Sequence, residues 1–207
     1  MTGPRPLHPG LNLGPGHPGA HEAAEKLMFG FWIFMMSDLV LFGAFLGTYA
    51  SMANPMGRAM GPGPAEVFNL GSVALQTALL LGSSYTMGLA SIAMKHRRRD
   101  LVRWLLASLV MGLGFLVLEM RDLVGMIGMG AGPTRSGWLS AYFALIGLHG
   151  LHVAAACLWL VVMLAQIRVF GLADAVKLRL MRLALFWHFL DIVWIGIFSV
   201  VFLAGLA

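Results

Sequence analysis

Five long apolar stretches, separated by shorter polar segments, dominate the hydrophobic pattern of this chain. None of them alternates polar and apolar residues in the way that predicts a half-buried strand. A helix needs about 20 apolar residues to cross a hydrocarbon layer about 30 Å thick, and each stretch is long enough to do so. The stretches cover residues 27–50, 67–94, 101–124, 138–166 and 183–207.

Hydrocarbon contains no hydrogen-bond partners, so each backbone N–H and C=O group in these stretches must be paired within the protein. Helices satisfy this requirement, whereas strands would need a closed barrel with alternating residues. We therefore expect an all-α fold, an integral membrane bundle of five transmembrane helices formed by residues 26–207. Residues 1–25 are rich in Pro, Gly and His, and we expect them to form a disordered N-terminal tail.

The composition agrees with a membrane protein. Of the 207 residues, 59% are hydrophobic and 11% are charged, whereas soluble domains have about 45–50% apolar and about 25% charged residues. The formal net charge is +5. The basic residues lie in short clusters between the apolar stretches, and this placement indicates membrane orientation and not nucleic-acid binding.

Basic residues concentrate in two of the links between the stretches. Residues 95–103 and 168–182 are strongly basic, whereas residues 51–66 and 121–137 contain fewer basic residues and more Gly and Pro. Basic links of membrane proteins face the cytoplasm. The pattern therefore predicts a cytoplasmic N-terminus and, because the number of spans is odd, a periplasmic C-terminus.

Ionisable side chains inside the apolar stretches are the candidate functional residues. Each costs about 2.5–3.5 kcal/mol at the centre of a membrane helix on insertion scales, so each needs a partner or a function. Their positions allow a polar seam between the first, fourth and fifth stretches. The candidates are Asp38, Glu119, His149, His152, His188 and Asp191.

Two interpretations of the acids remain open. Asp38 and Glu119 can be stations of a proton path, because a buried carboxyl can take up and release protons. They can equally be neutral acids that fix the register of neighbouring helices. His188 and Asp191 are three residues apart in the sequence, so they can pair on one helical face.

His149 and His152 are also three residues apart, and imidazole is a common metal ligand. A bis-histidine haem site needs a facing histidine at the same depth, and His188 is offset. Interhelical hydrogen bonds explain the pair better. The single cysteine, Cys157, cannot form a disulfide within the chain. We therefore expect no metal and no redox cofactor on this chain.

The sequence also lacks a phosphate-binding loop, an HExxH motif and a GxSxG motif. We therefore expect no catalytic residues on this chain alone.

Four stretches of the sequence resemble subunit III of the haem-copper respiratory oxidases, in their order and in their placement on the first, fourth and fifth spans. Among these oxidases, the five-span form is similar to the type found in cytochrome o ubiquinol oxidase, whereas the cytochrome c oxidase form has seven spans. The resemblance begins near Glu22 and continues to the end of the chain. The stretches are FGFWIFMMSDLVLFGAFLGTYA from Phe29, GMGAGPTRSGWLSAYFAL from Gly128, GLHGLHV from Gly147 and FWHFLDIVW from Phe186.

The resemblance implies a subunit of a proton-pumping quinol oxidase in a bacterial cytoplasmic membrane. Its partners would be a catalytic subunit I that carries the haems and copper, a subunit II and a small subunit IV. In the family, the acid of the SE/SD motif reacts with hydrophobic carbodiimides, and Asp38 matches this position with the shorter side chain. Glu119, in LVLEMRD, matches a second family acid.

Family members also hold phospholipid in a cleft between helices. The remaining candidates resemble its polar lining, and bound quinone is a further expectation. These candidates are His149, His152, His188 and Asp191.

Three alternatives remain at this point. Related five-span chains occur as accessory subunits of nitric oxide reductases, and the family also serves cytochrome c oxidases. A small transporter could use Asp38 and Asp191 to coordinate a substrate, although the chain lacks the internal repeat that is typical of transporters.

Overall fold

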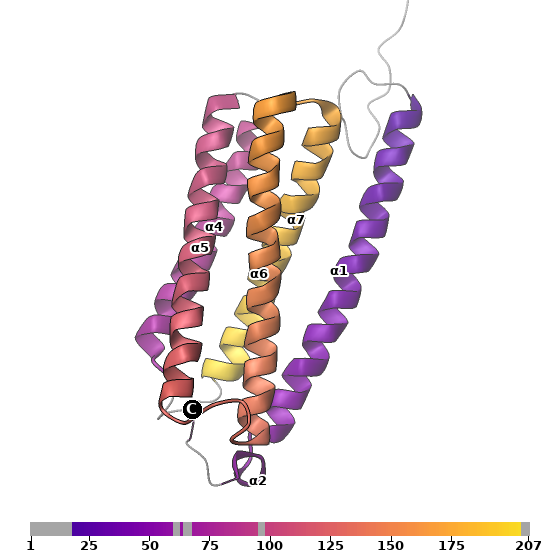
Figure 1. The fold of residues 1–207 in the computed structure, drawn as a ribbon. Coiled ribbons are helices and arrows are strands. Elements are labelled where there is room, and N and C mark those ends of the chain that lie inside the picture. The colour runs from indigo at the N-terminus through magenta and orange to yellow at the C-terminus, as the bar shows by residue number, and fades with distance from the viewer. Residues whose placement is uncertain (1–17, 60–62, 64–67, 95–97, 204–207) are drawn as a thin grey trace, which may run out of the picture.

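The computed structural model describes residues 18–59, 63, 68–94 and 98–203, and within these residues it contains helices and no strand (Figure 1). Five of the described helices are long and apolar enough to cross a membrane, which confirms the predicted fold class. They are α1 (Pro18–Met52), α4 (Leu70–Ala93), α5 (Arg98–Gly128), α6 (Gly137–Phe170) and α7 (Asp174–Ile197). A short helix α2 (Pro55–Arg58) follows α1, and a π-helix, η1 (Phe198–Leu203), continues α7.

Two helices begin earlier than the hydrophobic pattern predicts. α1 begins at Pro18, so residues 18–25 belong to a helix and not to the tail predicted for residues 1–25, whose first 17 residues lie outside the described part. α7 begins at Asp174, inside the basic segment that we had expected to be a link. Ala, Glu, Lys and Arg are strong helix formers. Hydropathy therefore detects only the apolar part of each helix.

Capping side chains determine where α4 and α6 begin. The side-chain oxygen of Asn69 accepts hydrogen bonds from two backbone N–H groups in the first turn of α4. Ser136 accepts one from the N–H of Leu139 at the start of α6. Such caps satisfy backbone donors that have no partner inside the helix. At its other end α6 stops at Gly171, whose φ of 67° favours glycine.

The helices α4, α5, α6 and α7 form the body of the bundle, and α1 is peripheral. α1 packs against α6 and α7, and Figure 1 shows that it leans away from the bundle towards its N-terminal end. Of the apolar window in α1, 17% is buried, compared with 50% in α7. α7 is therefore the central helix of the described chain.

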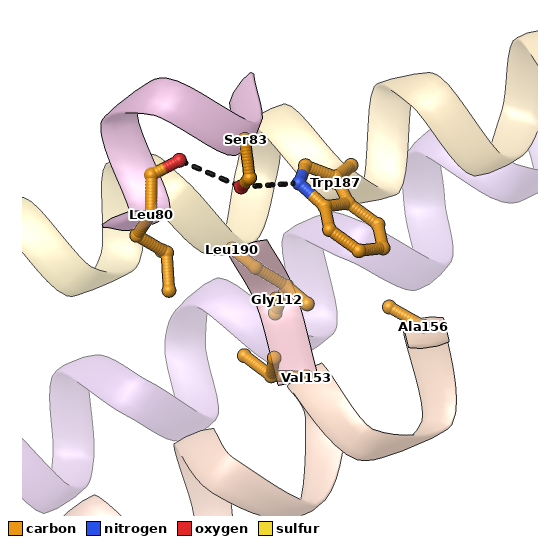
Figure 2. A pocket seen from close by; sticks show the side chains of 7 residues that line it. All are labelled: Leu80, Ser83, Gly112, Val153, Ala156, Trp187 and Leu190. Carbon is orange, nitrogen blue, oxygen red and sulfur yellow. Dashed lines mark hydrogen bonds between the residues drawn. The ribbon is translucent and has the colours of Figure 1, made fainter. Parts of the chain in front are cut away.

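Indole side chains of α7 form hydrogen bonds with hydroxyl groups of α4. Trp187 donates its Nε1–H to Ser83 Oγ over 2.9 Å, and Ser83 in turn donates to the carbonyl oxygen of Leu80 (Figure 2). Trp194 donates to Thr77 Oγ1 over 3.0 Å. Hydrogen bonds of this kind hold membrane helices together. They set how far α7 can slide or turn against α4.

A glycine on α5 makes room for the indole of Trp187. A Cβ atom added at Gly112 would lie 3.0 Å from the Trp187 ring and 3.1 Å from Cys157 Sγ. The ring cannot move freely, because Ser83 binds its nitrogen. We therefore expect Gly112→Ala to lower the free energy of unfolding by about 1–3 kcal/mol, the usual cost of overpacking a core.

Thermal unfolding of the purified protein in detergent micelles measures this effect. Gly88→Ala is the matched control, because a Cβ there meets nothing within 4 Å. Equal unfolding temperatures for the two variants would contradict the proposed role of Gly112.

Candidate functional site

The six candidate residues lie at separate helix–helix contacts and do not form one site. Asp38 is on α1, Glu119 on α5, His149 and His152 on α6, and His188 and Asp191 on α7. Contacts between α1, α6 and α7 correspond to the seam expected between the first, fourth and fifth spans. The expectation omitted α4, whose Ser84 contacts His188 of α7.

Asp38 and His152 face each other where α1 meets α6. The Oδ2 atom of Asp38 lies 3.7 Å from His152 Nε2, and the side chains are 12% and 18% exposed, respectively. The rings of Phe42 and Phe186 lie beside the imidazole, with centroid distances of 5.3 and 6.3 Å. The carboxyl and the imidazole therefore have each other as polar neighbours in an aromatic surrounding.

A backbone carbonyl determines which nitrogen of His152 carries the proton. Nδ1 lies 2.7 Å from the carbonyl oxygen of Leu148, and it must donate there because a carbonyl group only accepts. In the neutral ring, Nε2 is then an acceptor, and it faces the acceptor oxygens of Asp38. At 3.7 Å the two atoms form no hydrogen bond, and Asp38 Oδ2 has no hydrogen-bond partner in the described structure.

His149 is fully buried between α6 and α7. Its Nε2–H donates to the carbonyl oxygen of Leu190 over 3.3 Å, and its Nδ1 has no hydrogen-bond partner. The rings of Phe115 and Trp194 lie 5.6 and 5.1 Å from the imidazole centroid. His149 and His152 thus both lie beside Phe42 of α1, but their nitrogen atoms contact different backbone carbonyls, those of Leu190 and Leu148.

His188 contacts Ser84 of α4, with Ser84 Oγ 2.7 Å from His188 Nδ1. The Oδ1 atom of Asp191 is buried and has no hydrogen-bond partner in the described structure. The partner of the histidine therefore comes from another helix.

The Glu119 carboxyl packs against Gly150 of α6, where the lack of a side chain leaves room for it. Only 4% of Glu119 is exposed, and a Cβ added at Gly150 would lie 2.7 Å from its Oε2. Its Oε1 atom has no protein hydrogen-bond partner. A cavity of about 20 Å³ lies beside it, lined among others by Gln76, Asp122 and Tyr142. This volume is large enough for one water molecule.

A polar cluster next to this cavity was not foreseen from the sequence. Asp122 accepts hydrogen bonds from Ser72 and from Gln76, over 2.5 and 2.7 Å, and Arg121 pairs with its other oxygen over 3.1 Å. One sequence signal points to it, since the amide of Gln76 lies inside an apolar stretch, whereas Arg121 and Asp122 stand at the end of a span, where charged residues are ordinary.

These contacts join the helices of the bundle. Among the residues that the structure describes, no three His, Cys, Asp or Glu side chains come together as metal ligands would. Each candidate histidine instead contacts a protein group, namely the Leu148 carbonyl, the Leu190 carbonyl or the Ser84 hydroxyl.

Comparison with known proteins agrees with the resemblance of the motifs. The family model "Cytochrome c oxidase subunit III" matches residues 15–206. The cytochrome bo(3) ubiquinol oxidase subunit 3 of Pseudomonas aeruginosa is 43% identical over 93% of this chain and 92% of its own length. The protein of the same name from Pseudomonas putida is 40% identical over 89% of each chain. The quinol oxidase subunit 3 of Bacillus subtilis is 36% identical over 89% of this chain and 90% of its own length. The chain therefore belongs to the cytochrome c oxidase subunit III family.

Proposed function

We propose that this chain is subunit III of a terminal ubiquinol oxidase, which couples quinol oxidation to the reduction of oxygen to water. The observation that carries this proposal is the similarity over nearly the whole chain to proteins named ubiquinol oxidase subunit 3 or quinol oxidase subunit 3. These names favour a quinol oxidase over a nitric oxide reductase or a cytochrome c oxidase. With five spans and bacterial relatives, the chain is a multi-pass protein of the bacterial cytoplasmic membrane.

In the proposed complex this chain has a structural and supporting role. The haems and copper belong to the catalytic subunit I, and subunit II and a small subunit IV complete the assembly. Contacts of the candidate histidines with protein groups support this division of roles. Basic residues in segments 95–103 and 168–182 support a cytoplasmic N-terminus and a periplasmic C-terminus.

Co-purification tests this assignment. A tag at the N-terminus should recover haem and quinol-driven oxygen uptake in fixed ratio from gently solubilised membranes, because the subunits form one complex. Reduced-minus-oxidised spectra and an oxygen electrode provide the two measurements. The chain expressed alone should carry neither haem nor activity. Recovery of a solitary, haem-free protein from its native membrane would contradict the assignment.

Asp38 supports proton uptake by the complex. The buried carboxyl inside an apolar span, 3.7 Å from the imidazole of His152, supports this role. We expect Asp38→Asn to lower turnover, or to make the oxidase inactivate about threefold faster during turnover. This factor corresponds to about 0.6 kcal/mol, the average for a polar contact in a membrane. Oxygen uptake followed to exhaustion measures both the initial rate and the inactivation.

Asp174→Asn is the control for this experiment, since it makes the same change at an exposed acid in the first turn of α7. If Asp38→Asn behaves like the control in rate and in inactivation, Asp38 has no proton-related role.

Phospholipid binds in a groove between the cytoplasmic ends of α4 and α5. The groove has a volume of about 520 Å³ and is lined by apolar residues together with Asp100, Arg103 and Trp104. The Arg103 side chain is 80% exposed and pairs with Asp100 over 3.6 Å. The sequence places further basic residues in segment 95–99. Together these features suit an anionic headgroup with its acyl chain along the groove.

Thermal inactivation of the complex in detergent tests this site. Phosphatidylglycerol should stabilise the wild type more than phosphatidylcholine does. Arg103→Gln should weaken that effect about fivefold in lipid concentration, because one basic residue contributes about 1 kcal/mol of attraction. Arg135→Gln, which removes an exposed charge in the link between α5 and α6, should leave the effect unchanged. An equal loss in both variants would argue against a specific site.

A further inference from the structure

The small cavity beside Glu119 has the size and the lining of a water site. Its volume is about 20 Å³, and one water molecule needs about 10–15 Å³ together with two to four polar partners. The lining includes polar side chains from α4, α5 and α6 in addition to apolar residues. These polar residues are Gln76, Glu119, Asp122 and Tyr142.

The carboxyl of Glu119 lacks a partner that such a water molecule can supply. Glu119 is 4% exposed, and its Oε1 atom finds no hydrogen-bond partner among the described residues. Burying a carboxyl oxygen without a partner is costly. Gly150, against which the carboxyl packs, has no side chain to offer. The cavity is therefore the place from which Oε1 can be hydrogen-bonded.

A second small cavity, drawn in Figure 2, differs in both respects. Its volume is about 10 Å³ and its lining is mostly apolar. The hydroxyl in it, that of Ser83, already donates to the carbonyl oxygen of Leu80 and accepts the indole N–H of Trp187. The polar side-chain atoms of this described lining are thus paired with protein groups, and we expect this cavity to stay dry.

A wider groove brings the cavity beside Glu119 close to one end of the bundle. The groove has a volume of about 320 Å³ and lies where α4 and α6 begin and α5 ends. Some residues line both the groove and the cavity, so a single layer of side chains separates the two spaces. The shared residues are Val73, Asp122, Tyr142 and Phe202.

Polar groups continue through this layer. The Arg121 side chain is 62% exposed and pairs over 3.1 Å with Asp122, whose side chain is 26% exposed. Asp122 in turn accepts a hydrogen bond from the buried Gln76 over 2.7 Å. Glu119 lies one turn deeper in α5, about 14 Å from the helix end at Gly128 at 1.5 Å per residue. Ionisable groups inside a span commonly face a water-filled space.

We propose that the cavity beside Glu119 binds a water molecule that exchanges with the groove at Arg121 and carries protons between Glu119 and that end of the bundle. When the carboxyl O–H bond breaks, its proton moves to the water oxygen, and one proton of that water passes to water in the groove. The reverse steps restore the acid. The site belongs to this chain alone and does not depend on the oxidase assignment.

Radiolytic hydroxyl-radical labelling of the full chain in gently solubilised membranes tests for the water, because radicals formed from bound water oxidise the side chains beside it. We expect label on Tyr142 and Trp194, which line the cavity although they are buried. Tyr49 and Trp187 are the matched controls, since they are similarly buried and lie outside this cavity. Equal labelling of the two pairs would show a dry cavity and overturn the proposal.

The same measurement after rapid mixing with water enriched in the heavy oxygen isotope gives the rate of exchange. Gly125 lines the groove, and a Cβ there meets nothing within 4 Å. We expect Gly125→Trp to slow the exchange about tenfold by crowding the groove. Gly128→Trp is the control, because this position is equally open but lies outside the groove. Equal rates in the two variants would refute exchange through the groove.

Infrared spectroscopy follows the proton. The carbonyl band of the Glu119 acid is the band that Glu119→Gln removes, and we expect it to shift in heavy water as fast as the labelled water enters. A missing band, or a shift much slower than water entry, would refute the proton route. Radiolytic labelling of the wild type needs no variant, so the water site remains testable if Glu119→Gln fails to assemble.

Discussion

In hydrocarbon a polar group has no water to bind, so the indole N–H groups of α7 depend on the hydroxyl oxygens that α4 brings to them. Side-chain contacts join the two helices at successive levels along their length. Because each contact has a direction, together they fix both the rotation and the vertical position of α7. Both α6 and α1 pack against α7, so their positions depend on the position of α7. The pairs are Thr77 with Trp194, Ser83 with Trp187, and Ser84 with His188.

Hydrophobic length predicted the number and type of the spans because a membrane leaves few alternatives to a long apolar helix. The ends of α1 and α7 were less predictable, since charged residues continue a helix beyond the hydrocarbon as readily as apolar ones. The partners of the candidate residues could not be predicted for a different reason. Spacing along one helix pairs His188 with Asp191, but it says nothing about Ser84, a residue whose hydroxyl is too weakly polar to stand out in an apolar stretch.

The two candidate acids have different surroundings, although they were considered together from the sequence. Asp38 faces an imidazole at the contact of the peripheral helix α1 with α6. Glu119 faces a glycine and a water-sized cavity inside the body of the bundle. A change at Asp38 therefore acts on how α1 is attached, whereas a change at Glu119 acts on the core. Their roles in the complex are separable for this reason.

The close approach of Glu119 to Gly150 also bears on how this family can vary. A Cβ atom at position 150 would lie 2.7 Å from the carboxyl oxygen of Glu119, so a side chain at position 150 fits only if this carboxyl moves or the side chain at position 119 is shorter. Relatives that carry a larger residue at the position of Gly150 should carry a shorter one at the position of Glu119, acquired together or in quick succession. Positions 119 and 150 should therefore change together during evolution, although they lie on different helices.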